Sequence, residues 1–320
     1  MTAKDFKPKA INQQTIVITG ASSGIGLATA EMAAKRGANV VLSSRNENEL
    51  IEICKKLTAA GYKAIGVKAD VKNKEDLENL RSQAERAFGK IDTWVNNAGG
   101  SIYGPLLEIP EFEERELFET NFWGTRHGCH VAVDAFKGHG GVIINVGSEV
   151  SARAIPLQGM YSATKHAVKA YTDALRMELD KDEVPIKVCL VRPTAIDTLF
   201  PEHAVNHLKS GEPSLPDPCY HPDYAAEKIL KCAENPERDV YVGAQSKLSA
   251  IMEFLAPGLT DKYMLKKLFD DQIKGTRTPH RIENEALFTP SALEGELRGH
   301  HKGKIKADKE MLKPHITDLN

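Results

Sequence analysis

Runs of β-branched and aliphatic residues alternate with amphipathic helical patterns along most of this chain. Strands that are joined by helices pair in parallel, and a parallel sheet needs helices on both of its faces. The sequence therefore predicts an α/β fold with a doubly wound parallel sheet, in a domain that spans residues 1–245. The apolar runs lie at 15–19, 40–44, 64–71, 91–95, 142–146, 186–191 and 239–243.

A glycine-rich turn follows the first predicted strand and opens the first predicted helix. It reads Thr19-Gly-Ala-Ser-Ser-Gly-Ile-Gly and ends at Gly26. Glycines allow a phosphate to approach the backbone closely, and free N–H groups at a helix N-terminus attract anions. The spacing differs from the G-x-G-x-x-G of the standard dinucleotide fingerprint, so a turn that serves only packing is an alternative. Its position after the first strand favours a nucleotide phosphate.

The end of the second strand predicts which dinucleotide binds. Proteins selective for NAD(H) carry Asp or Glu about 20 residues beyond the glycine turn, where the carboxylate accepts a ribose hydroxyl. Ser44 and Arg45 occupy this place, and a guanidinium suits a 2′-phosphate. The sequence therefore favours NADP(H) over NAD(H). In the alternative, Arg45 is a surface residue and Glu47 or Glu49 contacts the ribose.

A serine, a tyrosine and a lysine predict a site for proton transfer. Ser148 follows the strand 142–146, and Tyr161 and Lys165 lie four positions apart at the start of the helix predicted over 158–180. Residues at this spacing share one helix face, with Cβ atoms about 5–6 Å apart. A nearby ammonium favours the phenolate, so we expect Lys165 to lower the pKa of Tyr161 from about 10. Taken alone, the pair could also be a solvated surface pair.

Polar residues also stand at other strand ends and inside one helix. Asp70 closes the third strand and Asn96-Asn-Ala-Gly closes the fourth, and ligands of doubly wound sheets bind beyond such carboxyl ends. Asn121 lies close to Gly124 inside the helix predicted over 113–137. Asparagine and glycine are poor helix formers, so we expect either a distortion kept for function or a plain surface kink.

Taken together, these segments resemble the classical short-chain dehydrogenases/reductases. The resemblance covers residues 10–245 and rests on five motifs in order: the glycine turn, Asn96-Asn-Ala-Gly, Asn121, Ser148 and Tyr161-x-x-x-Lys165. It implies a Rossmann-like fold and an NAD(P)(H)-dependent oxidoreductase that reduces a carbonyl, or oxidises an alcohol, on a small molecule. It also implies a homodimer or homotetramer.

The resemblance assigns catalytic roles to four residues. Tyr161 would be the general acid in reduction and the general base in oxidation. Ser148 would donate a hydrogen bond to the substrate oxygen. Lys165 would bind the nicotinamide ribose, and Asn121 would hold a water in a proton relay to Lys165.

The cofactor contacts that the resemblance implies come from the strand ends and the turns after them. Asn96 and Ala98 would lie at the adenosine ribose, while Asn97 braces the sheet. The chain departs from the family after the sixth strand, where Pro193-Thr194 stands in place of the usual Pro-Gly. The full set is Gly20, Ser22, Ser23, Gly24, Ile25, Gly26, Ser44, Arg45, Asp70, Val71, Asn96, Ala98, Gly99, Tyr161, Lys165, Pro193, Thr194, Ile196 and Thr198.

Composition argues against several classes of protein. The net charge is −2, with basic and acidic residues interspersed, which argues against nucleic-acid binding. The five cysteines show no CxxC spacing, as expected for free thiols in a reducing compartment. No signal peptide and no apolar run of the roughly 18–20 residues that a spanning helix needs are evident. We therefore expect a cytoplasmic protein. The histidine pairs His203/His207 and His300/His301 lack the further ligands that would predict a metal site.

Residues 246–320 form an extension beyond the domain that the motifs define. An apolar stripe at helical spacing predicts helices to about residue 290, followed by a charged, loosely ordered tail from about Ser291. We expect the stripe to pack on its own domain, over the substrate cleft or at a subunit contact. The segment 199–221 is rich in Pro and His, which predicts a mobile loop.

Two other functions fit the sequence. One is a non-catalytic NADP(H)-binding redox sensor, which the proton-transfer residues argue against. The other is a peripheral membrane enzyme that acts on a lipid-like substrate, held at the membrane by the basic amphipathic stripe at 246–270. The substrate itself is not predicted, because the candidate pocket residues Arg153, Ile155, Gln158 and Met160 are of mixed polarity.

Overall fold

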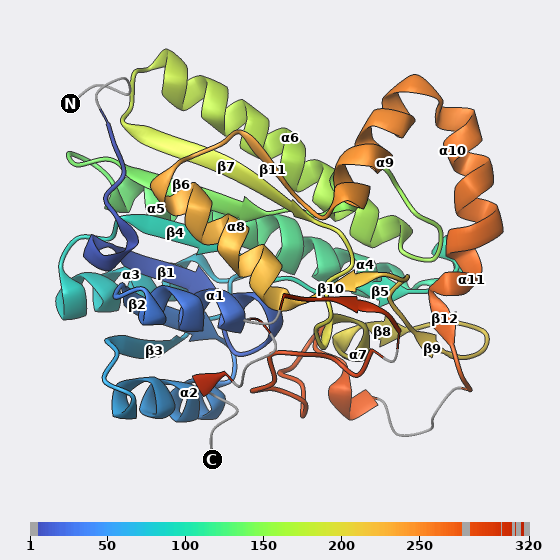
Figure 1. The fold of residues 1–320 in the computed structure, drawn as a ribbon, viewed down its shortest axis with the longest axis horizontal. Helices are drawn as coiled ribbons and strands as arrows, with labels where there is room; N and C mark the ends of the chain where they lie inside the picture. The colour runs from blue at the N-terminus through green and yellow to red at the C-terminus, as the bar shows by residue number, and fades with distance from the viewer. Residues whose placement is uncertain (1–5, 277–281, 302, 309–310, 312–314, 317–320) are drawn as a thin grey trace.

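A parallel sheet forms the centre of the molecule. The structure is a computed structural model that describes residues 6–276, 282–301, 303–308, 311 and 315–316. The sheet has seven strands in the order β11-β7-β6-β4-β1-β2-β3 (Figure 1), so the predicted doubly wound α/β fold is confirmed. The strands are β1 (Thr15–Thr19), β2 (Asn39–Ser44), β3 (Ala64–Lys68), β4 (Thr93–Asn96), β6 (Gly141–Val146), β7 (Ile186–Pro193) and β11 (Asp239–Val242).

Helices cover both faces of this sheet. Every residue of β1 and β6 is buried, as expected for central strands of a parallel sheet. Helices α1, α2 and α8 pack on one face, and α3, α5 and α6 pack on the other (Figure 1). Their bounds are α1 (Gly24–Lys35), α2 (Glu47–Ala59), α3 (Lys74–Phe88), α5 (Gly124–Ala135), α6 (Gly159–Lys181) and α8 (Pro222–Glu234).

The chain changes direction across the sheet between β1 and β4. Strands β2 and β3 lie on one side of β1, whereas β4, β6 and β7 lie on the other. Such a reversal opens a crevice beyond the carboxyl ends of the central strands. The glycine turn after β1 and the turn at 96–99 after β4 therefore meet at this crevice.

The helix predicted over 113–137 consists of two α-helices joined by one wider turn. The helices α4 (Glu111–Phe118) and α5 flank a π-helical turn at Glu119–Trp123. Asn121 lies in this turn, so the predicted distortion is present. Turns of this kind occur frequently at functional sites.

The segment 199–221, predicted as a mobile loop, contains short elements that pair with distant parts of the chain. No local periodicity records such pairing, because each partner strand is only two residues long and lies far away in sequence. The short helix is α7 (Phe200–His203), and the strand pairs are β8 (Val205–Asn206) with β5 (Ile102–Tyr103), β9 (Glu212–Pro213) with β12 (Ile273–Lys274), and β10 (Cys219–Tyr220) with β13 (Ile305–Lys306).

The extension is helical to Asp271, and a short 3₁₀ helix (Ile282–Asn284) follows within the region predicted to be helical. Figure 1 shows its helices α9 and α10 at one end of the molecule, away from most of the sheet. The described part of the tail, predicted to be loosely ordered, contacts the domain: Leu297 is buried in the same apolar cluster as α1. The elements are α9 (Ala244–Leu255), α10 (Pro257–Tyr263), a π-helical turn (Met264–Leu268) and α11 (Phe269–Asp271).

Candidate active site

A cavity of about 700 Å³ lies at the carboxyl ends of the central strands. Its wall combines the glycine turn, the strand ends, the segment after β7 and the helices of the extension. Of the predicted catalytic residues, Ser148, Tyr161 and Lys165 line it. The predicted cofactor contacts that line it are Gly20, Ser22, Ser23, Gly24, Ile25, Ser44, Arg45, Asp70, Val71, Ala98, Gly99, Pro193, Thr194, Ile196 and Thr198.

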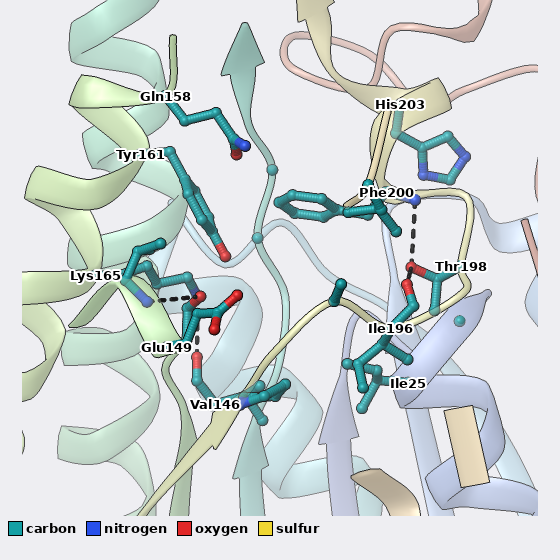
Figure 2. A pocket seen from close by; sticks show the side chains of 18 of the residues that line it. Ile25, Val146, Glu149, Gln158, Tyr161, Lys165, Ile196, Thr198, Phe200 and His203 are labelled. Carbon is teal, nitrogen blue, oxygen red and sulfur yellow. Dashed lines mark hydrogen bonds between the residues drawn. The ribbon is translucent and has the colours of Figure 1, made fainter. Parts of the chain in front are cut away.

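Tyr161 and Lys165 project from one face of α6 into this cavity (Figure 2). Lys165 Nζ lies 5.8 Å from the centroid of the Tyr161 ring and donates a 2.9 Å hydrogen bond to the carbonyl of Val146. Ser148, which follows β6, shares a hydrogen bond with Tyr161. On the opposite wall, the ring of Phe200 lies 5.3 Å from that of Tyr161, centroid to centroid. The fold thus brings the serine, the tyrosine and the lysine together.

Burial governs the protonation of this pair. It raises the pKa of Tyr161 to about 12, against the hydrogen bond with Ser148, which lowers the pKa. Burial also lowers the pKa of Lys165 to about 8. The prediction that Lys165 lowers the pKa of Tyr161 is therefore wrong in this structure. Desolvation disfavours the charged form of both groups, and for Tyr161 it outweighs the hydrogen bond with Ser148.

Glu149 is a site residue that the sequence analysis missed. It directly follows Ser148 and lines the cavity. Burial raises the pKa of its carboxyl to about 7, although a hydrogen bond with Thr194 and the charge of Arg192 lower it. A carboxyl that titrates near neutral pH beside Tyr161 can exchange protons with its surroundings. Its position directly after a serine at a strand end was the available signal.

Asn121 holds the backbone beside the cavity. Its side chain is fully buried, and its Oδ1 accepts a hydrogen bond from the Gly100 N–H at 2.9 Å. Its Nδ2 donates to the Gly100 carbonyl and to Thr164 Oγ1, each at 3.0 Å. Both amide N–H bonds are thereby used within the chain. The role of Asn121 in holding a relay water remains a prediction.

The glycine turn packs too closely for side chains and fits a bound phosphate. A Cβ on Gly26 would lie 2.1 Å from the carbonyl oxygen of Gly20, and Gly20 itself has a φ of +63°. Asn97 Nδ2 donates to the carbonyls of Thr19 and Gly20, both at 3.0 Å. These contacts leave no room for side chains at the N-terminus of α1, where a dinucleotide pyrophosphate would bind. Gly26 serves this packing rather than the cavity wall.

Asn96 packs inside the fold, whereas Asn97 lines the cavity. Asn96 Nδ2 donates to Asn145 Oδ1 at 2.8 Å, and Asn96 Oδ1 accepts from Trp94 Nε1 at 2.9 Å. A Cβ on Gly128 of α5 would lie 1.9 Å from Asn96 Oδ1, so this side chain fills the space under the helix. The Asn96 side chain is therefore used within the fold and does not line the cavity, so it does not make the predicted ribose contact. Asn97 lines the cavity and also braces the sheet as predicted, through its hydrogen bonds to Thr19 and Gly20. Neighbouring side chains along an extended chain point to opposite faces.

The helices of the extension form part of the cavity wall. Arg153, only 5% exposed, forms ion pairs with Glu253 of α9 and with Asp261 of α10, the latter at 2.8 Å. Gln158 Nε2 donates to Gln272 Oε1 at 2.8 Å, just beyond α11. Part of the apolar stripe therefore packs over the cleft as expected, whereas Ile251 and Leu255 stay exposed. The lining residues from this region are Met252, Leu259, Thr260, Tyr263, Met264, Leu268 and Gln272.

The predicted pocket residues divide between the cavity and the core. Arg153, Ile155 and Gln158 line the cavity. Met160 packs instead against a buried apolar cluster that includes Tyr161. The wall therefore offers both apolar and polar surface to a substrate.

A separate histidine cluster joins the tail to α1 and α8. Ligand atoms of His221, Asp223 and His315 lie within 4.8 Å of one another. Nδ1 of His315 lies 3.0 Å from Glu31, and its Nε2 lies 3.3 Å from Asp223. Burial lowers the pKa of His315, but the two carboxylates outweigh burial and raise the pKa to about 9. The two carboxylates therefore favour the protonated form of His315.

Sequence comparison identifies the family to which this fold and cavity belong. The profile of the family described as short chain dehydrogenase matches residues 14–208, which include the glycine turn and the Ser148–Tyr161–Lys165 group. The chain therefore belongs to the short-chain dehydrogenase family of oxidoreductases.

Similar proteins include further oxidoreductases. The chain is 41% identical over 304 residues to the uncharacterized oxidoreductase YxnA of Bacillus subtilis (strain 168), covering 94% of this chain and 85% of the relative. It is 40% identical over 168 residues to an (S)-acetoin-forming diacetyl reductase of Staphylococcus epidermidis (strain ATCC 12228 / FDA PCI 1200), covering 52% and 65%. The match to YxnA reaches well beyond the residues that the family profile matches.

Solved structures of the same fold contain either nicotinamide cofactor. A short-chain dehydrogenase from Burkholderia phymatum in complex with NAD has a TM-score of 0.70 and 25% identity, over 80% of this chain and 96% of that one. One from Burkholderia cenocepacia J2315 in complex with NADP has a TM-score of 0.67 and 27% identity, over 81% of this chain and 100% of that one.

In the described part of this chain, no helix is both long and apolar enough to cross a membrane.

Proposed function

We propose that this protein is an NAD(P)(H)-dependent oxidoreductase that reduces a carbonyl, or oxidises the corresponding alcohol, on a small molecule. The proposal rests on one observation. The glycine turn lines the same cavity of about 700 Å³ as Ser148, Tyr161 and Lys165. A cavity of this size is in the range of small-molecule sites. The nicotinamide, when bound, supplies the hydride chemistry.

The side chains supply position and the proton. Hydride transfer to a carbonyl places negative charge on the substrate oxygen, and donors aimed at that oxygen stabilise the transition state more than the ground state. Ser148 and neutral Tyr161 are such donors. Burial keeps Tyr161 protonated at neutral pH, which suits the donor role in reduction. Lys165 is positioned by Val146 to bind ribose hydroxyls beside Tyr161.

The preferred cofactor and direction are finer proposals. Taken alone, Arg45 at the end of β2 favours NADP(H), and NADPH would favour reduction over oxidation. Structures of similar fold contain NAD in one case and NADP in another, so a nicotinamide cofactor is supported in either form. The preference for NADP(H) remains a prediction.

The test is Tyr161→Phe, with Tyr171→Phe on the same helix as a matched control. NADH and NADPH oxidation would be followed over a panel of carbonyl compounds, and cofactor binding would be measured separately. We expect Tyr161→Phe to lose at least about 10²-fold in kcat, the lower bound for a general acid, with cofactor affinity nearly unchanged. Equal turnover of this variant would contradict the proposal. Cofactor binding by the wild type without turnover of any compound would favour the redox-sensor alternative.

An exposed apolar surface on the extension supports a second candidate, a peripheral membrane enzyme acting on a lipid-like substrate. Phe254, Leu255, Leu259 and Leu265 are between 64% and 86% exposed. Lys262, Lys266 and Lys267 lie among them in sequence, as in helices that bind membrane surfaces. Flotation with anionic liposomes would compare the wild type with Phe254→Ser/Leu265→Ser. Equal flotation of both proteins, or none of the wild type, would exclude this candidate.

A further inference from the structure

A C-terminal strap, residues 286–298, lies along the part of the cavity formed by the glycine turn and the end of β2. The Gly295 N–H donates to the Ser22 carbonyl at 3.0 Å, and the Gly24 N–H donates to the Glu296 carbonyl at 3.1 Å. Two backbone hydrogen bonds thus fasten the strap to the turn that would hold the dinucleotide phosphates. The strap residues Ala286, Leu287 and Glu294 line the cavity.

The position of the strap is fixed on both sides of this contact. Gly295 has a φ of +80°, a conformation that favours glycine over residues with a side chain. Arg298 Nε forms an ion pair at 2.8 Å with the fully buried carboxylate of Asp197. Leu297 between them is 3% exposed. The strap is therefore a built part of the cavity wall.

Arg45, the residue that favours NADP(H), is bound to this strap. Its guanidinium donates to the carbonyls of Leu287 at 3.1 Å and Thr289 at 3.2 Å, and makes a shorter contact with the carbonyl of Ala286. A 2′-phosphate could use Arg45 fully only by competing with these three carbonyls.

Glu294 places a carboxylate beside Arg45. The carboxylate shares hydrogen bonds with the side chains of Ser22 and Asn46, which follow β1 and β2. Burial raises the pKa of Glu294, while these hydrogen bonds and the charge of Arg45 lower it. Its Oε2 is buried and has no hydrogen-bond partner in the described part of the chain. A buried, unpaired acceptor is costly, and a hydroxyl donor would satisfy it.

The ends of β1 and β2 are where a dinucleotide-binding sheet holds the adenosine ribose. A ribose 2′-hydroxyl can donate to the carboxylate of Glu294, which lines the cavity. A 2′-phosphate offers no such donor when ionised and repels the carboxylate. We propose that Glu294 is a cofactor-selecting residue, which takes the place of the missing acid at the end of β2 and favours NAD(H) over NADP(H). The inference rests on the proposed function, and it reverses the preference that Arg45 alone predicts.

The test measures the dissociation constants of NADH and NADPH by fluorescence titration of the full-length protein, so no turnover is needed. The variants are Glu294→Gln and, as a matched control, Glu296→Gln. Glu296 is exposed, and its carboxylate lies 3.8 Å from His300 rather than in the cavity. A third variant, Glu294→Gln/Arg45→Gln, asks whether Arg45 supplies any gain.

We expect the wild type to bind NADH more tightly than NADPH. Glu294→Gln should lower the NADPH dissociation constant about tenfold or more, because it removes a negative charge that repels the 2′-phosphate. In Glu294→Gln, the affinity for NADH should stay equal or weaken. Glu296→Gln should match the wild type. Glu294→Gln/Arg45→Gln should lack the increase in NADPH affinity. An unchanged cofactor ratio in Glu294→Gln, an equal shift in Glu296→Gln, or a wild type that prefers NADPH would overturn the inference. Binding of neither dinucleotide would overturn the proposed function as well, whereas binding without turnover would overturn only the catalytic proposal.

Discussion

Arg153 Nη2 lies 2.8 Å from Asp261 Oδ1, and this ion pair joins the turn after β6 to helix α10 of the extension. Arg153 is 5% exposed, whereas the Asp261 side chain is 70% exposed. Exposed pairs contribute only about 0–1 kcal/mol each, so the value of Arg153 lies in holding both Glu253 and Asp261. The arginine thus positions α9 and α10 over the cavity.

We expect Arg153→Met to raise the KM for the carbonyl substrate severalfold, with the NADH and NADPH dissociation constants unchanged. Methionine keeps apolar bulk but cannot hold the two carboxylates. Asp261→Asn alone should have a small effect, and Glu253→Gln/Asp261→Asn should reproduce Arg153→Met. If the double variant behaves as wild type while Arg153→Met does not, Arg153 contacts the substrate directly and the positioning role is excluded.

Glu149→Gln should make the protein more stable at pH 8 and leave it nearly unchanged at pH 4.5. Burial raises the pKa of Glu149 from 4.5 to about 7, so the folded state keeps a proton that the unfolded state releases in this window. Stability therefore falls as the pH rises from 4.5 to 7, and glutamine removes this loss. Thermal unfolding of both proteins at the two pH values would measure the difference. An equal Tm difference at both values would contradict the assigned pKa.

The sequence predicted the parts of the site that are local in the chain. The glycine turn, Ser148 and the Tyr161–Lys165 pair depend on residues within one strand–turn–helix segment, and each lines the cavity. The Glu294 contact with Ser22 could not be predicted in this way, because it joins opposite ends of the chain through irregular backbone. The predicted direction of the Tyr161 pKa shift was wrong for a related reason. Spacing predicts that Lys165 lies nearby, but the burial that raises the pKa depends on the complete fold.

The placement of Asn96 and Asn97 shows a further limit. Both residues stand at one strand end, and a shift of one position sends a side chain to the opposite face. The packing of Asn96 under Gly128 of α5 joins segments far apart in the sequence, so local spacing does not show which asparagine faces the cavity.

Lys165→Met should abolish turnover yet stabilise the fold at pH 7. Burial lowers the pKa of Lys165 to about 8, so the charged form costs free energy below that pH. The free energy of unfolding should rise by about 1–2 kcal/mol. Removal of the buried charge stabilises the fold, but loss of the hydrogen bond to Val146 offsets part of this effect. Stability of the wild type should rise between pH 8 and 10, because the unfolded state still binds the proton that the folded state has lost.

Urea unfolding at pH 7 and pH 10 would measure this difference. The advantage of Lys165→Met should shrink at pH 10, where the folded lysine is neutral in the wild type. Lys169→Met, one turn further along α6, is the control, because its ammonium pairs with Asp173 at 2.7 Å. A Lys165→Met protein that is less stable than wild type at pH 7 would show that the charge of Lys165 stabilises the fold.

Asn121→Ala should destabilise the protein by about 2–5 kcal/mol, because it removes three hydrogen bonds, two to the half-buried backbone of Gly100 and one to Thr164 Oγ1. Asn121→Asp keeps the acceptor for the Gly100 N–H but loses the donor pair, and it buries a charge. We therefore expect both variants to lose stability. Thr164→Val removes one of the same hydrogen bonds from the other side, and it should cost about 1–2 kcal/mol.

These variants also separate structure from catalysis. If Asn121 acts only by holding Gly100, the loss of kcat should follow the loss of stability across Asn121→Ala and Thr164→Val. If Asn121 also holds a relay water, Asn121→Ala should lose much more kcat than Thr164→Val even at a temperature where both are fully folded. Urea unfolding and kcat at that temperature, measured on the same preparations, decide between the two roles.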